Sequence, residues 1–294
     1  MQFQAVSVGS AVPQDNFNAT IKHLFDSSLN LLLEHEDRLI TILSSGHYEL
    51  PQGIRLATKV PLQSLAVGLR AAARGGVLRF DYSPLTIDLR GTPIWDGRLS
   101  LLTGNIERAW LITWKTLNEG QRLKQSELIA KDLFQSNRGP PLTRKLSQPV
   151  HKLITAAKNM DAYASTSAAN EMIGLGPGIT PSGDDILIGF LAGLYSMAGH
   201  RKGALDFIHA FGNTLLRVSK ETNDISQTYI RHAVKGEFSS SISALIKVIN
   251  NGDEGRLITI TKDAMGVGHS SGMDSITGLL IGLAVWGVES FYPN

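Results

Sequence analysis

The chain has 294 residues, of which 43% are hydrophobic and 18% charged, and these values exclude an intrinsically disordered protein. The net charge of +2, with no basic stripe interleaved with aromatic residues, gives no support to nucleic-acid binding. Because the chain has no cysteine, it contains no disulfide, thiolate metal site or cysteine nucleophile, which is compatible with the cytoplasmic location that we expect.

The first six residues lack the basic and apolar regions of a signal peptide, so we expect none. The longest apolar stretches, 186–198 and 276–288, are rich in glycine and shorter than the roughly 20 apolar residues that a membrane-spanning helix needs. We therefore predict that both are buried core helices and that the protein has no membrane partner.

Residues up to about Trp95 indicate strands and turns. Residues 77–82 and 85–90 alternate between apolar and polar side chains, as half-buried strands do, and this alternation puts Asp88 and Arg90 together on the face away from the core. Two weaker strand candidates are 40–43 and 56–60, and the apolar spacing in 20–36 predicts a helix.

From about Ile106 the pattern becomes helical. The predicted helices cover 107–119, 127–135, 150–164, 204–221, 225–235, 240–250 and 257–264. The Arg-Gly-Pro-Pro segment at 138–141 is the best linker candidate, because a helix does not continue through it. We therefore expect an α+β protein, with a β-rich N-terminal domain at 1–105 and a mostly helical domain at 106–294.

One glycine-rich phrase occurs twice, at 182–194 and at 271–283, in the pattern S-G-x-D-x-x-x-G-x-L-x-G-L. Seven of the thirteen positions agree, and a G-x-G precedes each copy. Glycine inside a helix costs about 1 kcal/mol relative to alanine, so glycines at matching positions need a cause. Close helix packing and close approach of the backbone to a ligand are the two explanations that we consider.

In each copy two glycines lie four residues apart, Gly189 with Gly193 and Gly278 with Gly282, and so share one helix face. We infer that the two helices pack against each other around a pseudo-two-fold axis. That packing would bring both preceding loops to one end of the helical domain and create a shared pocket there.

Helix N-termini and successive glycine amides favour anions, so the two loops are candidate anion sites. The candidate substrate-binding residues are Gly176, Gly178, Thr180, Ser182, Gly183, Asn223, Ser226, Gly268, Ser270, Ser271 and Gly272. The candidate catalytic residues are His269, Asp184 and Asp274.

No cofactor is required by these motifs. A magnesium ion on Asp184 and Asp185 is an alternative, although consecutive helical residues point about 100° apart. Simple N-capping by the hydroxyls and acids, and glycines used only for packing, are the competing structural interpretations.

The segment 221–226 reads as a helix break with Asn223 or Asp224 as the next cap. The sequence has no P-loop, no dinucleotide-binding G-x-G-x-x-G, no H-E-x-x-H and no G-x-S-x-G.

The segments 174–185, 223–226 and 268–274, with 84–89 and Trp95 further upstream, resemble a bacterial family long known only as a domain of unknown function. Its best understood member is the AllH-type subunit of oxamate carbamoyltransferase. The resemblance extends from about residue 76 to residue 282. It implies a multi-subunit enzyme of purine (allantoin) catabolism that converts oxalurate and phosphate into oxamate and carbamoyl phosphate.

The implied partners are a small anionic substrate and other subunits, without which the chain would be inactive, and a homodimer is also compatible. Unlike aspartate and ornithine transcarbamylases, the chain has no S-T-R-T phosphate loop, and neither glycine phrase contains a basic residue. The missing cation would come from Arg90, Arg231 or Lys235, from a metal, or from a partner subunit.

Two other functions fit the residues. One is a magnesium-dependent hydrolase of the ADP-ribosylglycohydrolase type that uses Ser182, Gly183, Asp184 and Asp185 on a helical fold. The other is a non-catalytic scaffold whose glycines only pack helices.

Overall fold

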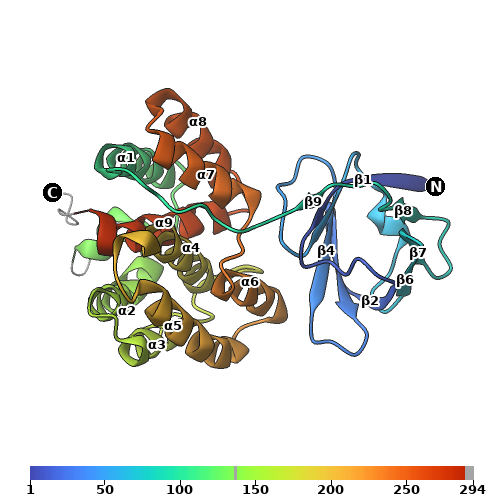
Figure 1. Cartoon of the computed structure of the whole chain (residues 1–294), viewed down its shortest axis with the longest axis horizontal. Coiled ribbons are helices and arrows are strands. Elements are labelled where there is room, and N and C mark those ends of the chain that lie inside the picture. The colour runs from blue at the N-terminus through green and yellow to red at the C-terminus, as the bar shows by residue number, and fades with distance from the viewer. Residues whose placement is uncertain (136–137, 289–294) are drawn as a thin grey trace. The chain divides into compact units, whose positions relative to one another are not determined.

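The computed structural model describes residues 1–135 and 138–288. The chain divides into two compact units, Met1–Gly97 and Arg98–Asn294. Strands make up the first unit and helices the second, so the predicted α+β class with strands before helices is confirmed (Figure 1).

The N-terminal unit is a single sheet in the order β5-β4-β3-β2-β6-β7-β8-β1-β9. Its strands are β1 (Gln2–Gly9), β2 (Phe17–Leu24), β3 (Ser28–Leu33), β4 (Leu39–Leu43), β5 (Gly53–Leu56), β6 (Arg70–Arg74), β7 (Val77–Phe80), β8 (Thr86–Asp88) and β9 (Ile94–Trp95). The sheet closes on itself, because β1 pairs in parallel with β8 and antiparallel with β5. Its inward side chains form one apolar core that includes Ile21, Leu31, Ile42 and Leu78.

The helix predicted over 20–36 is wrong, because this stretch forms the β2–β3 hairpin. The amide of Phe25 donates to the carbonyl of Ser28 at 2.9 Å, which makes the turn, and Ile21 pairs with Leu31 across the two strands. Leu29, Leu31 and Leu33 are buried at every second position, so the period is that of a strand. The leucines of this segment fit the period of a helix as well as that of a strand. Pairing within the closed sheet selects the strand.

The strand predicted at 40–43 is confirmed by β4, and the alternating segments at 77–82 and 85–90 contain β7 and β8. Asp88 and Arg90 form the expected pair, with Arg90 Nε 2.9 Å from Asp88 Oδ1 and Nη2 2.6 Å from Oδ2. These bonds hold the pKa of Asp88 below its usual range. The Asp88 side chain is buried, whereas an exposed pair was expected.

The C-terminal unit contains the α-helices. They are α1 (Glu107–Leu123), α2 (Pro141–Lys158), α3 (Ala162–Asn170), α4 (Ser182–Met197), α5 (Ala204–Val218), α6 (Asp224–Val234), α7 (Ser240–Asn251), α8 (Glu254–Met265) and α9 (Ser271–Gly287). Short 3-10 helices lie at η1 (Leu62–Ser64) in the first unit, and at η2 (Lys131–Phe134), η3 (Ala198–His200) and η4 (Ser219–Glu221) in the second.

Two predicted helices in this unit differ from the structure. The stretch 127–135 forms only the 3-10 helix η2. The stretch 150–164 is split between α2 and α3, because Met160 adopts a φ of 53° and the side chain of Asp161 then caps α3. Pro141 begins α2, which is the helix position where proline is best tolerated.

The two apolar glycine-rich stretches form α4 and α9, which lie side by side in the middle of the helical unit (Figure 1). Nearly every residue of both helices is buried, as expected for core helices. Among the described residues, every helix falls short of the length or the apolarity that crossing a membrane requires.

Candidate functional site

The helices α4 and α9 pack backbone to backbone at their glycines. A Cβ on Gly189 would collide with the carbonyl of Ser275, and a Cβ on Gly278 would collide with the carbonyl of Ile186. In the duplicated phrase Gly189 corresponds to Gly278 and Ile186 corresponds to Ser275, so exchanging the two copies turns one contact into the other. This reciprocity is the mark of the pseudo-two-fold axis predicted from the sequence.

The same reciprocal contacts recur one helical turn further along α4 and α9. A Cβ on Gly193 would press on the carbonyl of Leu279, and one on Gly282 would press on the carbonyl of Phe190. Contacts therefore advance in the same direction along both helices, so α4 and α9 are parallel. Both helix N-termini, with the loops that precede them, lie at the same end of the pair.

The two loops meet directly. We call residues 174–181 the first loop and residues 266–270 the second loop. Thr180 Oγ1 of the first loop lies 2.6 Å from Oγ of Ser271, the first residue of α9. The shared end that the sequence predicted is therefore present.

Glycines shape each loop in the same way. Gly183 donates its amide to the carbonyl of Leu175 at 2.8 Å, and Gly272 donates to the carbonyl of Val267 at 3.0 Å. A side chain at Gly183 would collide with the carbonyl of Met172, so the backbone approaches too closely for any Cβ. Gly176 (φ 118°), Gly178 (φ 100°) and Gly268 (φ 61°) also adopt conformations that favour glycine.

The first amides of α4 already have acceptors within the protein. Those of Asp184 and Asp185 donate to the carbonyl of Pro181 at 3.0 and 3.1 Å, and in α9 the amide of Asp274 donates to the carbonyl of Ser270 at 3.0 Å. These three amides are therefore not open to an anion in the way that orphan helix amides would be.

Capping does not explain the hydroxyls of the two phrases. The cap positions of α4 and α9 are Pro181 and Ser270, and neither makes a side-chain capping hydrogen bond. Ser182 is the first residue of α4 and is buried, with 2% of its surface exposed. Simple N-capping, the competing interpretation, is thus not what these residues do.

Asp184 anchors the first loop. It is fully buried, and its Oδ1 accepts from the amide of Gly174 at 2.8 Å while its Oδ2 accepts from Thr222 Oγ1 at 2.6 Å. Burial raises the pKa of Asp184, and the hydrogen bonds from Thr222, Gly174 and Ser226 partly offset that rise. Both carboxylate oxygens are therefore engaged in holding the loop to the turn before α6.

Asn223 connects the same turn to the loop. Its Oδ1 accepts from the amides of Ile225 and Ser226 at 3.1 and 3.0 Å, which confirms the predicted cap of α6. Its Nδ2 donates to the carbonyl of Ile179 at 2.9 Å. Ser226 is fully buried beside Asp184, although its Oγ makes no well-formed hydrogen bond.

Asp185 and Asp274, the carboxyl pair, occupy the same position in the two phrases and interact electrostatically across the axis. They are 5% and 1% exposed, and Oδ2 of each has no hydrogen-bond partner among the described residues. Burial, followed by the charge of Asp274, raises the pKa of Asp185 well above its usual value. Burial also raises the pKa of Asp274 to about 6.

The hydroxyls reach the carboxyl pair crosswise. Those of Ser271 and Thr180 lower the pKa of Asp185. The hydroxyls of Ser182 and Ser270 likewise offset part of the rise in the pKa of Asp274. Each carboxyl group is thus approached by the first helical serine of the opposite copy, as a two-fold arrangement requires.

A magnesium ion shared by Asp184 and Asp185 is not favoured by this geometry. The two side chains have different partners, and the oxygens of Asp184 are both occupied. Within residues 1–135 and 138–288, no group of three or more histidine, aspartate or glutamate side chains is arranged to hold a metal ion.

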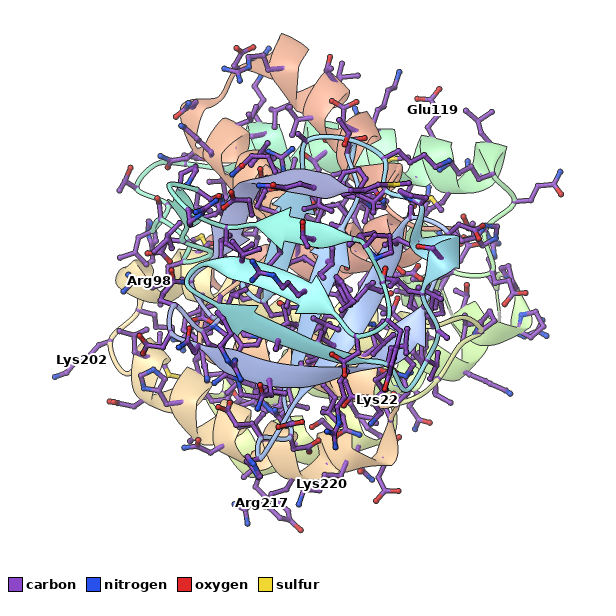
Figure 2. All side chains as sticks on the ribbon, turned by 90° about the vertical axis from the view of Figure 1, so that its right-hand side faces the viewer. Lys22, Arg98, Glu119, Lys202, Arg217 and Lys220 are labelled. Atoms are coloured by element: carbon purple, nitrogen blue, oxygen red, sulfur yellow. The ribbon has the colours of Figure 1, made fainter. Side chains whose placement is uncertain are left out.

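The basic residues proposed for the phosphate do not belong to α4 or α9: Arg90 is in the N-terminal unit, Arg231 is on α6 and Lys235 follows α6. Neither α4 nor α9 contains lysine or arginine. Lys235 follows the last residue of α6, about 18 Å by helix rise from the N-cap residue Asn223. The side chains of Lys202, Arg217 and Lys220 extend outward from the ribbon, as Figure 2 shows. His269 is exposed in the second loop.

Sequence reasoning missed two features of this site. Thr222 was not singled out, and nothing in the sequence indicates that its hydroxyl reaches Asp184. Asp185 was considered only as a metal ligand or a helix cap, although its alignment with Asp274 in the repeated pattern could have identified the pair.

Two family models match the chain. A model of the AllH family N-terminal domain matches residues 4–94, and a model described as oxamate carbamoyltransferase subunit AllH matches residues 172–283. No solved structure gives a significant match. The second match contains α4, most of α9, both loops and the turn before α6, and the two matches together cover more than half of the sequence. The chain therefore belongs to the AllH family of oxamate carbamoyltransferase subunits.

Proposed function

We propose that this chain is a subunit of a carbamoyltransferase and that the paired glycine loops bind its small anionic substrate. The reaction is conversion of oxalurate and phosphate into oxamate and carbamoyl phosphate. The observation that carries the proposal is the convergence of the two loops at one end of α4 and α9, where Thr180 meets Ser271 above two buried carboxyl groups. The family match supports the reaction class.

Carbamoyl transfer requires a carbonyl group that is held and polarised, and a phosphate that is bound beside it. The hydroxyls of Thr180, Ser270 and Ser271 are half-buried at the meeting point of the loops and are suited to the first task. The second task needs positive charge, which α4 and α9 lack. We therefore infer that a partner subunit supplies the phosphate-binding cation and that this chain alone does not catalyse the reaction.

The alternatives are less well supported. A magnesium-dependent hydrolase would need Asp184 free to bind metal, but both of its oxygens accept hydrogen bonds from the protein. Two buried carboxyl groups each have an oxygen without a hydrogen-bond partner, and such groups destabilise the folded state. A scaffold whose glycines only pack helices does not explain why these two acids are present.

The test is an assay of the complex purified with its native partner subunits. Thr180→Val and Ser271→Ala remove hydroxyls at the loop junction and leave the glycine backbone intact. Substitutions at Gly183 or Gly272 are unsuitable, because any Cβ there meets a backbone carbonyl and disturbs folding. Ser167→Ala, which removes an exposed hydroxyl on α3, is the matched control.

We expect both loop variants to lose about tenfold or more in carbamoyl-phosphate formation, since each removes a hydrogen bond to a polar group. The control should retain full activity. A wild-type complex without carbamoyl transfer, or loop variants as active as the control, would contradict the proposed function.

A further inference from the structure

The carboxyl pair has chemistry that the anion-binding role does not use. Two acids lie almost completely buried on the pseudo-two-fold axis, and each has an oxygen without a partner. The charged groups that raise the pKa of Asp185 within the described part of the chain are Asp274 of α9 and Asp184 of its own helix, and both are acidic. Among the described residues, no lysine or arginine compensates either member of the pair.

A proton is the group that can compensate this negative charge. Two carboxylates that face each other in a buried site cannot both remain ionised, so the pair titrates as a unit and keeps one proton over a wide pH range. Burial disfavours the doubly charged state further. The elements packed around the pair add hydroxyls, from Thr180, Ser182, Ser270 and Ser271, and not opposite charges.

A singly protonated carboxyl pair offers one O–H donor and one carboxylate acceptor side by side. A carbamoyl group offers the complement, because its carbonyl oxygen accepts a hydrogen bond and its NH2 group donates. We infer that the pair formed by Asp185 and Asp274 binds the carbamoyl group of the substrate, one carboxyl donating to its oxygen and the other accepting from its nitrogen. This inference rests on the proposed function and names the part of the substrate that the site takes.

The negative charge of the carboxyl pair makes it a poor binding site for the phosphate and carboxylate groups of the substrates. A phosphate or a carboxylate brought to this pair would meet negative charge with no cation beside it, whereas a carbamoyl group is neutral. A magnesium ion needs about six oxygen ligands in octahedral geometry, and the pair supplies two carboxylates with no third acid in a metal-binding group. The anionic end of the substrate therefore points away from the pair, toward the partner subunits.

Oxamate and oxalate are the probes that test this assignment. They have nearly the same size and each carries a carboxylate, but oxamate has a carbamoyl group where oxalate has a second carboxylate. Binding of each to the purified complex is measured by calorimetry from about pH 6 to about pH 9. We expect oxamate to bind at least about tenfold more tightly than oxalate at neutral pH, the equivalent of one good hydrogen bond to a charged group. Its binding should weaken as the pH rises and the pair loses its proton.

Two substitutions at one position sharpen the test. Asp185→Asn replaces the protonated acid by an amide that still has a donor, so oxamate binding should stay within about threefold of wild type and lose its alkaline decline. Asp185→Val removes the donor and should weaken oxamate binding by about tenfold or more. Asp263→Asn, an exposed acid on α8, is the control and should behave as wild type.

The inference is overturned if oxalate binds as tightly as oxamate, if both Asp185 variants bind oxamate like wild type at every pH, or if Mg²⁺ alone binds at the pair and abolishes the effect of pH. If transfer activity is intact and any of these results is found, the carbamoyl site is wrong while the proposed function stands. If the complex shows no transfer but oxamate binding follows the predicted dependence on pH and on Asp185, the carbamoyl site stands and the proposed function fails.

Discussion

The first loop with α4 and the second loop with α9 share their backbone contacts, but their side-chain contacts differ at the position before the paired acid. Gly189 and Gly278 make reciprocal backbone contacts, and Asp185 and Asp274 form one pair. The position before each of these acids differs. In the first copy it is Asp184, bonded to Gly174 and Thr222, and in the second it is Met273, a buried apolar residue whose sulfur accepts a hydrogen bond from Ser126 at 3.6 Å.

This difference shows how a two-fold scaffold can hold an asymmetric ligand. The shared residues build the helix contact and the carboxyl pair on the axis. The residues that differ tie only the first loop to α6, through Asp184 and Asn223. A carbamoyl substrate has two unlike ends, so we expect its orientation to be set by the unshared residues.

The largest expected effect tests the symmetry of the helix contact. Gly189→Ala and Gly278→Ala each place a Cβ against a backbone carbonyl of the partner helix. Because neither backbone can move without separating α4 from α9, each variant should lose about 4 kcal/mol or more of unfolding free energy. Urea denaturation measures this loss.

Gly255→Ala in α8 is the control, since its Cβ would meet only ordinary contacts, and it should be neutral or slightly stabilising. A cost below about 1 kcal/mol at either glycine, or a large difference between them, would break the two-fold interpretation.

A smaller effect is expected where the copies differ. Asp184→Ala removes the acceptor of two hydrogen bonds and leaves the Gly174 amide and the Thr222 hydroxyl unpaired, so it should destabilise the protein by about 3 kcal/mol. Met273→Leu at the matching position conserves volume and should cost less than about 1.5 kcal/mol. Unfolding free energies of the two variants give the comparison, and equal costs would mean that Asp184 is not the anchor described here.

The third prediction concerns pH and the carboxyl pair. Burial raises the pKa of Asp274 to about 6 from a usual value of 3.8. An acid whose pKa is raised on folding contributes stability that is complete below about pH 4 and is lost as the pH rises through about 6. Asp274→Asn should therefore be more stable than wild type by roughly 2 to 3 kcal/mol at about pH 8.

That advantage should largely vanish at about pH 3, where the wild-type acid is mostly neutral in both the folded and the unfolded state. Unfolding free energies measured at the two pH values decide the matter, with Asp263→Asn as the exposed control. A stabilisation of the same size at both pH values would show that Asp274 is not a buried titrating acid.

Much of the helical unit was predictable because its signals are local. Glycines four residues apart and the repeated S-G-x-D pattern indicated the pairing of α4 and α9, and the cap at Asn223 was expected from its own segment. The stretch 20–36 shows the limit, since its leucines fit a helix and a hairpin equally well and only closure of the sheet decided. The stretch 127–135 also differs from its prediction, because it forms only the 3-10 helix η2.

The sequence by itself determined the order of strands and helices, the duplication and the residues that would stand at the helix N-termini. Only the tertiary structure decided what those residues do. In the folded protein the amides of Asp184 and Asp185 donate to the carbonyl of Pro181, and the hydroxyl of Thr222 donates to Asp184. Asp185 interacts with Asp274, although 89 residues of sequence separate them. Burial and proximity change the charge and hydrogen bonding of a carboxyl group, and both arise only when distant segments pack together.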